Sequence, residues 1–215
     1  MPLIEEPGVR RGQFIALGGL KKHGKDAFAD FLAEDHGYIK LGMSDRLHEI
    51  ALVLNPWLRL DDNEMREIDS DRFTTYNYLT NLLGYAQAKD IREYREFLQT
   101  LGTDVGREMI APDFWALQAF QKIQKLLHEG KNVVLTATRF PNELDMTRQI
   151  DGISLWISRP NLIQAVDTHA SENSVSEKDF DHTVLNDGTL EELRSYADSV
   201  VRTLPRTKNL GVSQS

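Results

Sequence analysis

The sequence predicts an α/β fold with a doubly wound, mainly parallel sheet of five strands. Three observations predict it. Short apolar runs bounded by turn residues are typical of strands buried on both faces of a parallel sheet. Helical patterns separate these runs, and such alternation implies right-handed crossovers. The 215 residues, 40% hydrophobic and 27% charged, fit one globular domain of ordinary size.

The expected elements alternate along the chain. Strands are expected at 14–17, 38–41, 133–135, 153–157 and 183–185. Helices are expected at 25–36, 44–54, 142–150 and 190–204, with a long helical region over 63–129. Thr189, with Glu192 three residues later, predicts a capping box for the last helix. We therefore expect one domain at 13–204, preceded by an arm at 1–12 and followed by a tail at 205–215.

Two stretches are longer than a simple alternation of strands and helices requires. Residues 56–129 hold far more helix than one crossover needs, so a separate helical insert is expected at about 56–112. The polar segment at about 160–181 is typical of a loop that covers a site, although a plain surface excursion fits nearly as well. This layout suits a small-molecule kinase, which needs a second pocket for the acceptor and a lid that excludes water.

Composition narrows the class of partner. A formal net charge of −8 argues against broad binding to nucleic acid or anionic membranes. No apolar stretch approaches the roughly 20 residues that span a bilayer, and the first residues lack a secretion signal. The chain has no cysteine, which excludes disulfides and thiolate metal sites. We expect a cytoplasmic protein that binds small molecules, and the sequence leaves a homodimer open.

The segment at 19–26 (Gly-Leu-Lys-Lys-His-Gly-Lys-Asp) lies between the first expected strand and helix. Two glycines five apart, followed by lysine, match a phosphate-binding loop. Such a loop turns its N–H groups, and the start of the next helix, toward phosphate. Lys25 would hold the outer phosphates, and Asp26 replaces the usual serine or threonine as a metal-linked or water-ordering group. An ordinary strand–turn–helix is the alternative.

Other motifs narrow the nucleotide chemistry. No Asp-x-x-Gly follows the loop and no Asn-Lys-x-Asp occurs, which argues against a GTPase. The strand at 133–138 ends without an acidic residue for magnesium. Magnesium would then be held by Asp26, by a carboxylate such as Asp45, or by substrate phosphates and water.

Polar residues after later strands are candidates for substrate binding. Arg139 follows the strand at 133–138, at the edge where open α/β sheets bind ligands, and could grip a phosphate. Glu143 could accept hydrogen bonds from a base or orient Arg139, or it could simply favour a helix start. Gly102 and Thr103 suggest a helix break with an anion site for Arg107, or an ordinary junction. Trp115 could stack on a base, although at helical spacing such a residue is more often core.

These segments together resemble the phage deoxynucleoside monophosphate kinases. The resemblance is carried by the loop at 19–26, by Leu-Gln-x-Leu-Gly-Thr-Asp-x-Gly-Arg-Glu at 98–108 with Asp-Phe-Trp at 113–115, and by Arg-Phe-Pro-Asn-Glu at 139–143. His-x-Ser-Glu at 169–172 and Asn-Asp-Gly-Thr-Leu at 186–190 extend it, so it covers roughly residues 14–204.

The resemblance implies a P-loop kinase core of the adenylate kinase type, with a helical acceptor-binding insert and a lid loop. It implies transfer of the γ-phosphoryl group of ATP, with Mg²⁺, to a deoxynucleoside monophosphate, which supplies precursors for phage DNA synthesis in the host cytoplasm. The implied catalytic residues are Lys25, Asp26, Arg107 and Arg139. The implied ATP-binding residues are Gly19, Lys21, Lys22, His23, Gly24, Lys25, Asp26, Arg159, Asn186 and Gly188. The implied acceptor-binding residues are Asp45, Arg46, Thr103, Arg107, Trp115, Arg139 and Glu143, and the implied metal residues are Asp26 and Asp45, directly or through water.

Two positions depart from the family pattern. Ala27 stands where members often carry threonine, and Ala137 where they often carry aspartate, which removes a hydroxyl and a carboxylate from the metal region. Two alternatives therefore stay open. One is a kinase of another small acceptor, such as dephospho-coenzyme A, and the other is a nucleotide-binding regulatory or scaffold protein without turnover.

Overall fold

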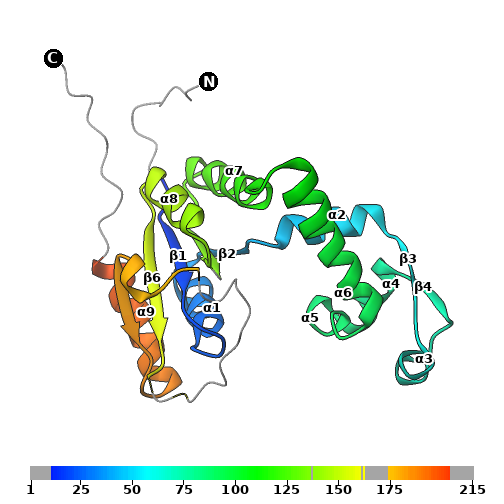
Figure 1. The fold of residues 1–215 in the computed structure, drawn as a ribbon. Helices are drawn as coiled ribbons and strands as arrows, with labels where there is room; N and C mark the ends of the chain where they lie inside the picture. Colours follow the sequence, from blue (N-terminus) through cyan, green and yellow to red (C-terminus); the bar gives the residue numbers. More distant parts are fainter. Residues whose placement is uncertain (1–10, 137, 161, 163–173, 204–215) are drawn as a thin grey trace. The chain divides into compact units, whose positions relative to one another are not determined.

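The computed structural model describes residues 11–136, 138–160, 162 and 174–203 (Figure 1). The structure does not describe residues 1–10 of the expected arm, residues 161 and 163–173 of the expected lid, or the expected tail. The chain divides into two compact units. We call Met1–Met43 with Ala119–Ser215 the sheet unit, and Ser44–Gln118 the helical unit. The helical unit contains the residues expected to form the insert.

The sheet unit is built on five parallel strands, which confirms the predicted fold class. They are β1 (Phe14–Gly18), β2 (Ile39–Gly42), β5 (Val133–Thr136), β6 (Ile153–Ser158) and β7 (His182–Leu185). Their order is β2-β5-β1-β6-β7, and every neighbouring pair is parallel. Each residue of β1 and β5 is buried, as expected for strands covered on both faces. The carboxyl ends of these strands therefore meet at one edge of the sheet.

Helices cover both faces of this sheet. They are α1 (Lys25–His36), α7 (Phe114–His128, in this unit from residue 119), α8 (Pro141–Gln149) and α9 (Leu190–Thr203), with a short 3-10 helix η3 (Glu177–Asp179). Successive strand residues point to opposite faces. Ile15 and Leu17 accordingly pack in the cluster with α1 and α9, whereas Phe14 and Ala16 pack in the cluster with α7. The central strand β1 is thus fixed from both sides.

The capping box expected at the start of α9 is confirmed. The Glu192 N–H donates to Thr189 Oγ1 at 3.2 Å, and the Thr189 N–H donates to Glu192 Oε2 at 2.7 Å. The pair satisfies N–H groups that a helix start leaves without intrahelical partners.

The helical unit has its own core around two buried tyrosines. Its elements are α2 (Asp45–Leu54), β3 (Trp57–Arg59), α3 (Asp62–Ile68), β4 (Phe73–Thr75), α4 (Tyr76–Leu83), α5 (Tyr85–Ala88), α6 (Arg92–Gln99) and the π-helix η1 (Thr100–Ile110). The rings of Tyr76 and Tyr94 are both buried and stack at 4.2 Å between centroids. Leu60, Leu79, Ala51 and Ala88 are the other fully buried residues described in this core.

Two features of the helical unit differ from the sequence prediction. The region expected to be helical contains part of an antiparallel ribbon, β3 with β4. Each strand has three residues, with only Leu58 and Thr74 buried, and so short an alternation gives no distinct signal. The helix break expected at Gly102 is also wrong, because α6 continues into η1 through Thr103. An anion site at a helix start there is therefore excluded.

Packing explains the glycine at position 106 of this π-helix. A Cβ atom on Gly106 would lie 2.3 Å from Trp115 Nε1, so only glycine lets the indole approach.

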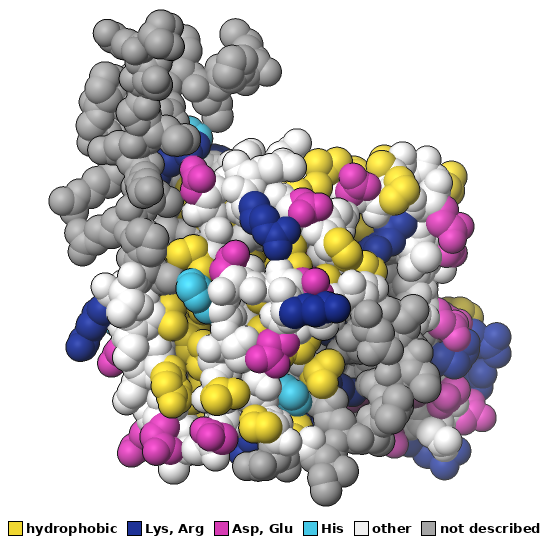
Figure 2. Space-filling model, turned by 60° about the vertical axis from the view of Figure 1, so that its left-hand side comes forward, with side chains coloured by type: hydrophobic (Ala, Val, Ile, Leu, Met, Phe, Trp, Pro, Cys, Tyr) yellow, Lys and Arg dark blue, Asp and Glu magenta, His cyan; other side chains and the backbone are white. Residues whose placement is uncertain are grey.

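The described surface carries mixed charge. Figure 2 shows hydrophobic, acidic and basic side chains interspersed on the face that it presents, without a broad basic area among the described residues there. Within the part of the chain that the structure describes, no helix is both long and apolar enough to cross a membrane.

Candidate active site

The predicted phosphate loop connects β1 to α1 in the sheet unit (Figure 1). Gly19, Lys22 and Gly24 all have positive φ, at 128°, 65° and 97°. A Cβ atom on Gly19 would lie 2.3 Å from the carbonyl oxygen of Ile157, at the end of β6. A Cβ atom on Gly24 would lie 2.5 Å from Asn186 Nδ2, just after β7. The two glycines of the motif are thus required by backbone conformation and by close packing.

Lys25 lies at the first position of α1 and folds back over the loop. Its ammonium Nζ donates to the carbonyl oxygens of Gly19 at 2.6 Å and Leu20 at 2.7 Å. Both acceptors belong to the loop, so the positive charge is kept there. The start of α1 adds the positive end of its helix dipole to the same place.

Asp26 follows in the first turn of α1 and faces solvent. Its side chain is 81% exposed, and its carboxylate lies 3.9 Å from Lys40 Nζ. Lys40 pairs more closely with Asp30, at 2.7 Å. Among the described residues, no three acidic or histidine side chains gather into a metal site. A metal bound at Asp26 would take its remaining ligands from phosphate and water, as Mg²⁺ commonly does.

Three of the predicted ATP-binding residues meet behind the loop. The His23 side chain is buried, and its Nδ1 accepts a hydrogen bond from the Arg159 backbone N–H at 3.1 Å. The His23 carbonyl accepts one from Asn186 Nδ2 at 2.9 Å, and Asn186 is also buried. Gly188 lies further along, in the exposed turn before α9. The structure therefore joins His23, Arg159 and Asn186 from three distant parts of the sequence.

The environment of His23 disfavours its charged form. Burial lowers the pKa of the His23 imidazole, and a hydrogen bond with the Ile157 carbonyl opposes this by raising it. The positive charges of Lys25 and Arg159 lower it further. The neutral imidazole is therefore the form that this position favours.

Arg139 and Glu143 lie at the carboxyl end of β5. Glu143 is buried, and its Oε2 accepts the backbone N–H groups of Arg139 at 2.7 Å and Phe140 at 3.2 Å. This is the environment expected of a glutamate that stabilises a helix start, here that of α8. The carboxylate therefore holds the backbone of Arg139, and contact of Glu143 with a base stays a prediction.

Sequence reasoning missed Thr138 at this edge. Its side chain is buried and its N–H donates to the Leu17 carbonyl at 2.9 Å, beside the start of the loop. Its Oγ1 has no hydrogen-bond partner among the described residues. A threonine two residues after the end of a buried strand could have signalled a group at the ligand edge.

The remaining predicted acceptor residues belong to the helical unit. Asp45 begins α2, and Arg46 pairs with Glu49 at 2.7 Å on the exposed side of that helix. Thr103 and Arg107 are exposed on η1. Trp115 is buried, and its Nε1–H donates to the Gly102 carbonyl at 2.7 Å. Its indole is thus part of the packed core, while its role toward a base stays a prediction.

The helical unit also contains an aromatic and charged cluster that no motif indicated. The rings of His48 and Tyr85 lie 3.9 Å apart, and Lys89 Nζ lies 3.7 Å from the Tyr85 ring centre. His48 Nδ1 and the Tyr76 hydroxyl are hydrogen-bonded at 2.7 Å. Burial lowers the pKa of Lys89, and the nearby Asp45 carboxylate opposes this. Its members come from α2, α4, α5 and the turn after α5, so no local spacing could have predicted it.

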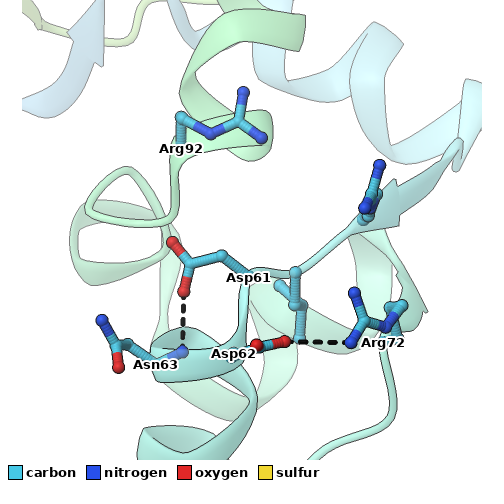
Figure 3. Close-up of a pocket in the computed structure, with 7 residues that line it drawn as sticks. Asp61, Asp62, Asn63, Arg72 and Arg92 are labelled. Carbon is cyan, nitrogen blue, oxygen red and sulfur yellow. Dashed lines mark hydrogen bonds and ion pairs between the residues drawn. The ribbon is translucent and has the colours of Figure 1, made fainter.

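A pocket of about 510 Å³ in the helical unit contains none of the predicted site residues (Figure 3). Arg59, Arg72 and Arg92 line it together with Asp61 and Asp62. Its carboxylates already have structural partners. Asp62 pairs with Arg72 at 2.9 Å, and Asp61 caps the start of α3. The two carboxylates of this pocket are thus explained by the local fold.

Known proteins resemble this chain in sequence. A family model described as deoxynucleotide monophosphate kinase matches residues 45–196. The deoxynucleotide monophosphate kinase of Enterobacteria phage T4 is 23% identical over 241 residues, covering 89% of this chain and 100% of that protein. An uncharacterized protein of Ictalurid herpesvirus 1 (strain Auburn) is 32% identical over 114 residues, and the match spans 52% of this chain and about half, 48%, of that relative.

Solved structures give a more distant likeness. The Mycobacterium tuberculosis APS kinase CysC, in complex with AMPPNP and APS, shares 10% identity at a TM-score of 0.48. That match covers 90% of this chain and 99% of the other. The assignment comes from the sequence comparisons, whose family model spans well over half of the 215 residues. The chain belongs to the deoxynucleotide monophosphate kinase family and is a phosphotransferase.

Proposed function

We propose that this deoxynucleotide monophosphate kinase transfers the γ-phosphoryl group of ATP to a deoxynucleoside monophosphate and releases the diphosphate. One observation carries the proposal: the loop between β1 and α1 has both motif glycines at positive φ and the Lys25 ammonium folded over it. Such a loop places backbone N–H groups, a helix start and a mobile cation at one point, as triphosphate binding requires.

Positioning and charge neutralisation account for most of the catalysis of phosphoryl transfer. The acceptor phosphate is already anionic, so no strong general base is needed. Lys25 would neutralise the transferring phosphates. Arg139, whose backbone is held by the buried Glu143, would bind phosphate from the end of β5. Arg107 is the second arginine that we propose for phosphate binding. Lys21, Lys22 and Arg159 add positive charge around the triphosphate.

The other predicted acceptor residues keep their proposed roles in the helical unit. Asp45, Arg46 and Thr103 would contact the nucleoside monophosphate, and Trp115 would border its base. Asp45 would reach the acceptor from the first turn of α2.

Magnesium fits the residues present. When bound, Mg²⁺ supplies neutralisation of the phosphate charge. Asp26 would hold it, directly or through water, because its carboxylate is exposed in the first turn of α1. Asp45 is the second proposed residue for the metal. We further propose that the protein acts in the cytoplasm of a host cell, where its product would supply DNA synthesis.

The proposal is tested by assaying ADP formation from ATP with each of the four deoxynucleoside monophosphates. ATP binding and folding are measured on the same sample. We expect turnover with at least one acceptor, and ribonucleotides and dephospho-coenzyme A serve as competing acceptors. A folded protein that binds ATP but phosphorylates none of the four would refute the proposed function.

A further inference from the structure

We propose that His23 is a positioning residue of the phosphate loop. Its neutral imidazole and its carbonyl join the loop to the ends of β6 and β7, and this pair of attachments fixes the directions of the loop peptides. We call the attachments, made to Arg159 and to Asn186, the loop clamp. The inference rests on the proposed function, since it says how the same loop is held in its binding geometry.

The first attachment determines the protonation state of His23. The Arg159 N–H lies 3.1 Å from His23 Nδ1, and a backbone N–H can only donate a hydrogen bond. Nδ1 must therefore carry a lone pair, which places the proton of the neutral ring on Nε2. A side chain with no acceptor at this point would leave the Arg159 N–H without this partner at a part-buried site.

The second attachment orients the next peptide. Asn186 Nδ2 donates to the His23 carbonyl at 2.9 Å, and Asn186 also lies against Gly24. In a trans peptide the C=O and the following N–H point in opposite directions. The Gly24 N–H is therefore turned away from Asn186. We assign that opposite side to the phosphate.

The same rule applies at the start of the loop. Lys25 Nζ donates to the carbonyl oxygens of Gly19 and Leu20. The N–H groups of the same two peptides belong to Leu20 and Lys21, and they therefore point away from these two carbonyl–ammonium hydrogen bonds. The His23 N–H donates to the Leu20 carbonyl at 3.3 Å, which closes the turn. The hydrogen bonds accepted by these loop carbonyls thus determine the directions in which the loop N–H groups point.

Protonation of His23 would open the clamp. A proton on Nδ1 removes the acceptor for Arg159, and the new charge would face Lys25 from α1 and the Arg159 side chain from the end of β6. Asn186, from the end of β7, is neutral, and the Ile157 carbonyl is the group that would favour the charge. We therefore expect the loop to lose its geometry when His23 is protonated at acid pH.

The experiment compares two replacements of His23 in the full chain. His23→Asn keeps an acceptor, because the asparagine Oδ1 can take the place of Nδ1, whereas His23→Leu removes it at similar size. We expect the leucine variant to lose about tenfold in kcat/KM for ATP, the effect of one part-buried donor that loses its acceptor. We expect the KM for the deoxynucleoside monophosphate to stay unchanged, and the asparagine variant to keep most of the activity. His182→Leu, at an exposed position on β7, is the matched control.

The pH profile gives a second readout that folding alone would not move. In the wild type, kcat/KM for ATP should fall on acidification below the ordinary histidine pKa of about 6.5. In His23→Asn the contribution of His23 to this acid limb should be missing, so that only the fall caused by protonation of the substrate phosphates, whose last pKa is about 6, remains. If the leucine variant does not fold, the asparagine variant and its pH profile decide the question. Equal losses in folded asparagine and leucine variants, no loss in either, or an unchanged acid limb would overturn the proposal.

A spectroscopic measurement separates this inference from the proposed function. The ¹⁵N shifts of the His23 ring, assigned by the loss of its signals in His23→Asn, report which nitrogen carries the proton. We expect the tautomer with the proton on Nε2, whether or not any acceptor is phosphorylated. A proton on Nδ1 at neutral pH would overturn the clamp even in an active kinase. An inactive wild type with the expected tautomer would refute the function alone.

Discussion

Replacement of Lys25 by methionine removes the ammonium and keeps the length of the side chain. In the free protein the change deletes the hydrogen bonds to the carbonyls of Gly19 and Leu20. Hydrogen bonds to charged groups contribute about 1.5–3 kcal/mol when well shielded. Lys25 is only partly buried and water can replace the ammonium at both carbonyls. We therefore expect a loss of about 1 kcal/mol in the free energy of unfolding, equivalent to about 2–4 °C in Tm.

The expected loss of activity is much larger. Removing one preorganised group that stabilises transition-state charge lowers kcat by about 10²–10³, or about 2.7–4 kcal/mol. Even a protein at the lower end of ordinary stability, about 5 kcal/mol, would keep about 4 kcal/mol after the substitution. Unfolding would then involve on the order of 0.1% of the molecules. Partial unfolding therefore cannot account for a hundredfold loss of turnover.

The assay measures kcat and KM for both substrates together with thermal unfolding. Lys125→Met is the matched control, because Lys125 is an exposed lysine of the same unit on helix α7 and lies outside every predicted site. We expect the control to retain wild-type kinetics. A folded Lys25→Met protein with kcat within about threefold of wild type would show that this loop does not bind the transferring phosphate.

Other predictions concern stability and are measured by urea or thermal unfolding. Gly24→Ala and Gly37→Ala both place a side chain at positive φ, at a cost of about 1–2 kcal/mol. The free energy of unfolding should fall by about 1–3 kcal/mol more in Gly24→Ala than in Gly37→Ala. The new Cβ at position 24 would lie 2.5 Å from a side-chain nitrogen, whereas a Cβ at position 37 would have no neighbour within 4 Å. Tyr76→Phe should lower the free energy of unfolding by about 1–2 kcal/mol, because the buried hydroxyl is hydrogen-bonded to His48. Tyr196→Phe, at an exposed position, should leave the free energy of unfolding unchanged. Burial chiefly lowers the pKa of His48, so the unfolded chain binds a proton that the folded chain does not. The free energy of unfolding should therefore fall as the pH drops below about 6.5, and a stability that rises on such acidification would contradict this sign.

Local signals were enough to predict α1 from residue 25 to residue 36. The helix begins after Gly24 and ends before Gly37, and both glycines have positive φ. The strands β1 and β5 were found because their apolar runs are buried on both faces of the sheet. In these segments the local preference and the tertiary environment agree, and the sequence is then informative.

The helical unit shows where such prediction stops. Gly102 breaks helices by local preference, yet its carbonyl accepts the Trp115 indole N–H and the helix continues through it. Gly106 is needed because the same indole lies against its Cα. Both effects depend on a partner several turns further along the chain. Propensity scales cannot include such a partner, so tertiary packing overrides them.

The clamp around His23 gives the same lesson for the site. Its two partners lie 136 and 163 residues away, at the ends of β6 and β7. The motif spacing could therefore locate the loop but not say which side chains contact phosphate and which hold the loop. In the structure Lys21 and Lys22 are exposed, whereas His23 is buried with its ring and carbonyl both bonded. Variation at positions 21 and 22 should thus change the charge around the phosphates, while variation at 23 should change the shape of the loop. A phosphate loop is in this sense specified by the ends of the neighbouring strands as much as by its own glycines.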